Sequence, residues 1–122
     1  MCNLEKTSLV AVELDKDVII ERTTITCEIQ FYSLTPKDEK SAEKSRAILV
    51  VLDAKTPTEG RYLKLKYRAV FSFDNENEIP EDNVFLERHY REAYAKFKIC
   101  AEKVLQVLDV PNLHFPDLDV GI

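Results

Sequence analysis

The side chains best suited to catalysis or metal binding in this sequence are its two histidines, His89 and His114. Zinc and catalytic sites combine histidine with further histidines, cysteines or nucleophiles at short, defined spacings. Neither histidine has a histidine or cysteine partner at such a spacing, and no serine lies in a nucleophile turn. The pattern therefore favours structural or exposed histidines over metal ligands or an acid–base pair.

The acidic segment 74–82 resembles a calcium-binding loop only in its charge. The EF-hand loop requires a glycine at its sixth position and a bidentate glutamate at its twelfth. Ile79 and Phe85 stand at those positions here, and the only glycines are Gly60 and Gly121. Walker loops and dinucleotide-binding turns need several glycines close together. We therefore expect no metal, no cofactor and no enzymatic activity.

A basic stripe, formed by Lys64, Lys66 and Arg68, falls on one face of an alternating segment. Binding of single-stranded nucleic acid combines such charges with stacking aromatics, and no aromatic shares this face. The net charge of −5 also opposes binding to nucleic acid or anionic lipid. A solvated sheet face is favoured over a nucleic-acid-binding surface.

The longest element predicted from the sequence is a helix over residues 80–108, which would be about 42 Å long. Pro80 suits its first turn and Pro111 its end. Its apolar residues recur at steps of three and four, which places them on one stripe: Leu86, Tyr90, Ala93, Phe97, Cys100, Val104 and Leu108. Further apolar residues lie off that stripe: Phe85, Ile99, Leu105 and Val107.

Alternating apolar and polar residues, with period two, predict strands over residues 7–14, 18–34 and 61–73, and a β-branched apolar run predicts a fourth over residues 46–54. In the second segment one face collects Ile25, Cys27, Ile29 and Phe31. In the last segment the core face collects Leu63, Leu65, Tyr67, Ala69, Phe71 and Phe73. Residues 46–54 are apolar on both faces, as in a central strand or one covered by a partner. Residues 35–45 and 55–60 are expected to be loops, and 111–116 to be extended.

These elements predict an α+β fold: an antiparallel sheet of three to four strands with one long helix packed on one face, in a single domain of residues 1–122. The core is expected between the helix stripe and the segment 61–73. The apolar surface exceeds what this layer can bury, which indicates a partner. Self-association and a groove for other apolar chains both remain open.

Composition is that of a soluble globular protein, with 45% hydrophobic and 32% charged residues. The sequence starts without a signal-peptide pattern, and no apolar run approaches the roughly 20 residues that cross a bilayer. Three cysteines occur without a C-x-x-C pair, and Cys27 and Cys100 are expected to be buried thiols. We expect a cytoplasmic protein without membrane insertion.

The order of elements resembles the bacterial export chaperone SecB and its small relatives. The resemblance rests on Arg46-Ala-Ile-Leu-Val-Val-Leu-Asp-Ala, followed after a loop by Tyr62-Leu-Lys-Leu-Lys-Tyr-Arg-Ala-Val-Phe-Ser-Phe-Asp-Asn-Glu. The alternating phenylalanines and acidic residues before a long helix are typical of small SecB-like proteins. Val110-Pro-Asn-Leu-His-Phe-Pro matches the family's proline segment after that helix. The resemblance covers about residues 25–118.

This resemblance implies a holdase that works without ATP and holds unfolded or unassembled polypeptides in an apolar groove. It also implies a homo-oligomer, a dimer or a tetramer, with a role in protein export or transport. The alternative is a SecB-like structural or regulatory oligomer without chaperone activity. Near the strand-to-helix junction the groove candidates are Phe71, Phe73, Phe85, Leu86 and Tyr90.

Three departures from the family qualify this expectation. The helix starts Val84-Phe-Leu-Glu-Arg-His-Tyr, where export chaperones have an aromatic-proline string, and no second helix follows before Ile122, so a shallower groove is expected. The export chaperone docks its translocation ATPase through an acidic sheet surface, whereas the basic stripe occupies that surface here. Docking of the ATPase is therefore not expected.

Overall fold

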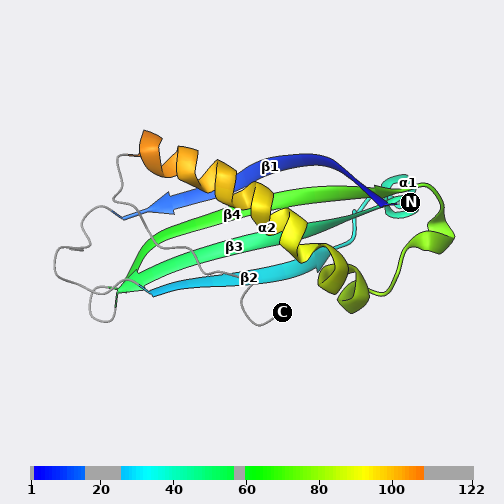
Figure 1. Cartoon of the computed structure of the whole chain (residues 1–122), viewed down its shortest axis with the longest axis horizontal. Coiled ribbons are helices and arrows are strands. Elements are labelled where there is room, and N and C mark those ends of the chain that lie inside the picture. The colour runs from blue at the N-terminus through cyan, green and yellow to red at the C-terminus, as the bar shows by residue number, and fades with distance from the viewer. Residues whose placement is uncertain (1, 16–25, 57–59, 109–122) are drawn as a thin grey trace.

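A computed structural model describes residues 2–15, 26–56 and 60–108 (Figure 1). Its elements in chain order are β1 (Cys2–Leu14), β2 (Thr26–Leu34), a one-turn helix α1 (Glu39–Ala42), β3 (Ser45–Thr56), β4 (Gly60–Phe73), a short 3-10 helix (Glu76–Glu78) and α2 (Asp82–Val107). The four strands form one antiparallel sheet in the order β1-β4-β3-β2. The predicted α+β fold with one long helix on one face of the sheet is confirmed.

The strand prediction is most accurate for the two central strands. On β4, Leu63, Leu65, Ala69 and Phe71 are fully buried on the face that carries the helix. On β3 the alternate residues Ile48, Val50, Leu52 and Ala54 are fully buried beside them. Ala47 and Val51 are buried too, on the opposite face of β3, as expected for an apolar central strand.

The region 35–45 is not wholly a loop, because α1 forms one turn within it. Asp38 caps this turn: the backbone N–H and the hydroxyl of Ser41 both donate to the Asp38 carboxylate. The predicted strand residue Ile25 and the extended segment 111–116 lie outside the described residues.

Helix α2 crosses the sheet diagonally, from the side of β2 at its start towards the side of β1 at its end (Figure 1). Its buried residues are Phe85, Ala93, Tyr94, Phe97, Ala101 and Leu105. The predicted stripe was therefore centred wrongly, because Leu86, Tyr90, Cys100, Val104 and Leu108 are only half-buried. The buried row advances by steps of four, and such a row is inclined by about 26° to the helix axis. A helix that packs along it must cross the strands at an angle.

Aromatic contacts fix this crossing at three points. Near the helix start, Phe31 of β2 meets Tyr90 edge-on, with ring centroids 5.2 Å apart. Phe71 of β4 meets Phe85 in the same way at 5.5 Å. Further along the helix, Phe97 lies over Tyr67. Within the described residues, no helix is long and apolar enough to cross a membrane.

Candidate functional site: an apolar groove between β1 and α2

A groove of about 680 Å³ opens between the edge strand β1 and the second half of α2. Tyr67 of β4 forms part of its floor, and Leu9 and Val12 line it from β1. The helix contributes the apolar side chains of Ile99, Cys100, Val104, Val107 and Leu108. The volume lies in the range of protein sites that hold small molecules or several side chains of a peptide.

Apolar side chains that remain in contact with water concentrate around this groove. Leu9 and Val12 are each 38% exposed, Ile99 is 54% exposed and Val107 is 84% exposed. Fully burying a side chain of this kind is worth about 1.5–3 kcal/mol. A contiguous apolar patch of this kind marks an interaction site. The groove can therefore bind apolar groups without any covalent chemistry.

The diagonal course of α2 creates the groove. The helix is held over β2 and β4 by its aromatic contacts up to Phe97, and beyond that point it runs towards the outer strand β1. Leu9 lies opposite Tyr67 in the strand register, and Val12 lies opposite Leu65. The apolar residues of β1 therefore extend the core face of the sheet outward, where the helix does not fully cover it.

An irregularity in β1 places both of its groove residues on the same face. In a regular strand, residues three positions apart point to opposite faces. The register between β1 and β4 shifts between Leu9 and Ala11, which leaves Val10 without a direct partner. This bulge allows Leu9 and Val12 both to point towards the helix. A second register shift, between Leu4 and Lys6, likewise places Leu4 and Thr7 on the same face nearer the start of β1.

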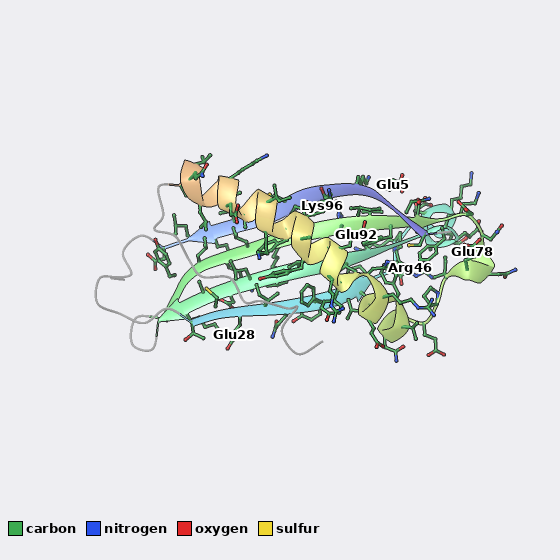
Figure 2. All side chains as sticks on the ribbon, in the orientation of Figure 1. Glu5, Glu28, Arg46, Glu78, Glu92 and Lys96 are labelled. Carbon is green, nitrogen blue, oxygen red and sulfur yellow. The ribbon has the colours of Figure 1, made fainter. Side chains whose placement is uncertain are left out.

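The groove carries positive charge at its border. Among the described residues that line it, Lys96 and Lys103 are the only charged ones, beside the hydroxyl groups of Thr7 and Ser8. Figure 2 shows Lys96 on the side of α2 that faces β1. Both lysines are exposed, and the structure records no ion pair for either of them among the described residues.

The groove candidates predicted from the sequence lie elsewhere, at the start of α2. Phe71 and Phe85 are fully buried and Phe73 is 5% exposed, so these three side chains belong to the core. Leu86 and Tyr90 are half-buried on the same part of the helix. Phe85 contacts both phenylalanines, with centroids 5.5 and 6.0 Å away. A role for these residues in polypeptide binding stays a prediction, and none of them lines the groove described above.

His89 is half-buried and packs against two phenylalanines of the core. Its ring lies 5.0 Å from that of Phe71 and 5.3 Å from that of Phe85. Burial is the main cause that lowers the pKa of His89; the Arg88 charge lowers it further and the Glu92 charge opposes the shift. His114 lies outside the described residues. Among the described residues, no three histidine, cysteine or acidic side chains are grouped to hold a metal.

The cysteines are less buried than the sequence indicated. Cys2, Cys27 and Cys100 are free thiols, and all three are half-buried. Desolvation raises the pKa of the Cys27 thiol. Desolvation is also the largest cause of the raised pKa of Cys2, and the Glu92 charge adds to it. Neither thiol therefore has the lowered pKa of a catalytic cysteine.

On the sheet face opposite the helix, acidic residues of the two neighbouring strands flank one end of the basic stripe. Lys64 lies between Glu13 of β1 and Asp53 of β3 in the strand register. Opposite charges on neighbouring strands attract each other. Lys55 adds an ion pair on the same sheet, with its amino group 3.7 Å from the carboxylate of Asp53. The face is therefore a mixed charged surface, which supports the interpretation of a solvated face.

Comparisons with known proteins show a relationship at the level of the fold. No protein-family model and no curated protein matches the chain. Among solved structures, it is similar to the Mycobacterium tuberculosis SecB-like chaperone Rv1957 in complex with a ChAD peptide from the Rv1956 HigA1 antitoxin. The TM-score is 0.64 at 12% sequence identity, over 99% of this chain and 93% of the other. The chain therefore has a SecB-like fold.

Proposed function

We propose that this SecB-like chain is a chaperone that holds extended apolar segments of unfolded or unassembled polypeptides, without ATP, in the groove between β1 and α2. The observation that carries the proposal is the ring of exposed Leu9, Val12, Ile99 and Val107 around that groove. The solved SecB-like chaperone of similar fold was captured with a peptide, which supports a polypeptide ligand.

The position of the groove suits a polypeptide in a second way. β1 forms one edge of the four-stranded sheet, so the main-chain groups along its outer side are not used by another described strand. An extended segment can pair with such an edge while its alternate side chains enter an adjoining pocket. The bulge at Val10 limits this pairing to short stretches. Binding should therefore tolerate many sequences and be weak at each site.

The proposal includes a cytoplasmic homo-oligomer. The opposite sheet edge, β2, pairs with β3 in unbroken register and exposes 45% of Tyr32 and 37% of Leu34. A regular, partly apolar edge strand is suited to pairing with a second copy. Light scattering should give a multiple of 14.1 kDa. A monomer at micromolar concentration would remove this part of the proposal. A role in protein export is compatible with the proposed chaperone function. The mixed charge around Lys64, however, does not favour docking of the translocation ATPase.

The experiment that tests the function compares two aspartate substitutions on the same exposed helix surface. Ile99→Asp places a charge in the groove, whereas Ala95→Asp places the same charge on an exposed part of α2 that does not line it. Both sites are exposed, so both variants should keep the fold. The wild type and Ala95→Asp should slow aggregation of an unfolded test protein, and Ile99→Asp should not.

Equal protection by both variants would show that the groove is not the binding site. If the wild type neither slows aggregation nor binds unfolded peptides at micromolar concentration, the chaperone function is wrong. A folded oligomer that fails both assays would favour the alternative, a structural or regulatory SecB-like oligomer.

A further inference from the structure

The charge at the groove is opposite in sign to that of the whole chain. The chain carries a net charge of −5, yet Lys96 and Lys103 are the only charged side chains among the described residues that line the groove. Glu92 stands one helical turn before Lys96, at a spacing that allows an ion pair. Glu92 does not line the groove, and the structure records no ion pair between the two. Both ammonium groups therefore remain available to a ligand.

The spacing of the two lysines defines the ligand they can bind. Seven residues separate Lys96 from Lys103, which is about 10.5 Å along a helix. An extended chain advances about 3.3 Å per residue and points every second side chain to the same face, so two carboxylates four residues apart, about 13 Å, can both face the long lysine side chains. Between the lysines the helix presents Ile99 and Cys100 to the groove. A matching segment has apolar side chains between its two carboxylates.

We propose that the groove selects extended polypeptide segments that combine apolar side chains with two carboxylates four residues apart. The proposal rests on the polypeptide-binding function proposed above and specifies its ligand. A polypeptide is favoured over an amphipathic lipid because the groove adjoins the sheet edge at β1, whose main-chain groups only a polypeptide can pair with. Clients rich in lysine and arginine are disfavoured by the same two charges.

Three labelled peptides of about eleven residues test this selection against the full-length protein. They share their apolar residues and differ only at two positions, which hold aspartate, asparagine or lysine. Fluorescence anisotropy at low salt should rank them in that order, with about a three- to tenfold loss of affinity at each step. High salt should reduce the differences, because the lysines are exposed.

Two double variants identify the charges responsible. Lys96→Gln with Lys103→Gln should abolish the preference for the aspartate peptide over the asparagine peptide. Lys64→Gln with Lys66→Gln makes the same change of net charge on the opposite sheet face and should leave the preference intact. Loss of the preference in this second variant would mean recognition by net charge alone and would overturn the proposal.

The remaining outcomes separate this proposal from the function on which it rests. Equal affinity for all three peptides overturns the selectivity and leaves polypeptide binding standing. Binding of none of them overturns both, and binding of decanoate in their place would assign the groove to an amphipathic anion. If the wild type binds no peptide and Ile99→Asp lowers the oligomeric mass, the groove is instead an interface with a second copy of the chain.

Discussion

Phe97 lies over Tyr67 with its ring centroid 5.9 Å away and the two rings inclined by 65°. Phe97 is fully buried, while Tyr67 is 4% exposed and forms part of the groove floor. Among the described residues, Phe97 is therefore the last aromatic side chain that holds α2 to the sheet, and its partner Tyr67 reaches the floor of the groove. The stability of the fold and the shape of the groove are coupled at this point.

The first prediction concerns this contact. Phe97→Ala should lower the free energy of unfolding by about 3–5 kcal/mol, because it removes a fully buried ring and leaves a cavity. Gln106→Ala, on the exposed side of α2, should change it by less than about 0.5 kcal/mol. Urea unfolding measures both values. Equal shifts of the two midpoints would mean that the helix does not pack as described.

The fold was predictable in segments whose apolar residues recur with one regular spacing. On β4 the residues from Leu63 to Phe73 alternate without interruption, and every second one is buried. The long helix was recognisable from its apolar spacing, but its buried face was not. A straight stripe through Leu86 and an inclined row through Phe85 fit the same sequence, and only the angle between helix and sheet decides between them.

The groove was harder to predict because it depends on tertiary structure. Ile99 and Val107 were recognisable as surplus apolar residues of the helix, which was a valid signal of an exposed patch. Their partners Leu9 and Val12 are three residues apart and fail the alternation test, because the bulge at Val10 is not visible in the sequence. We predicted a groove wall at Phe85 because the start of the helix follows directly after β4 in the sequence. The groove instead lies at the other end of α2, where the helix runs towards β1.

The second prediction distinguishes the aromatic core from a groove wall at the start of α2. Phe85→Asp should unfold the protein at room temperature, because a charge would replace a fully buried ring that touches Phe71 and Phe73. Leu86→Asp should leave it folded, because Leu86 is only half-buried. Circular dichroism and a urea titration provide the measurement. A folded Phe85→Asp protein with a native urea midpoint would contradict this placement of the ring.

The third prediction is a dependence of stability on pH through His89. Burial holds the pKa of His89 below its ordinary value of 6.5 in the folded protein. The unfolded chain therefore takes up the proton first as the pH falls, and stability decreases from about pH 6.5 downward. His89→Gln should flatten this decrease, measured as the urea midpoint between about pH 7.5 and about pH 5.5. An unchanged slope in the His89→Gln variant would mean that another group causes the decrease.

The last prediction uses Cys100 as a reporter of the occupied groove. Cys100 is half-buried and lines the groove, whereas Cys27 is half-buried on β2 and does not line it. A bound peptide should slow the reaction of Cys100 with N-ethylmaleimide several-fold, because it covers the thiol. The rate at Cys27 should stay the same and serves as the internal control. Mass spectrometry of proteolytic fragments separates the two rates. Protection of Cys27 without protection of Cys100 would place the bound peptide near β2 and away from the groove between β1 and α2.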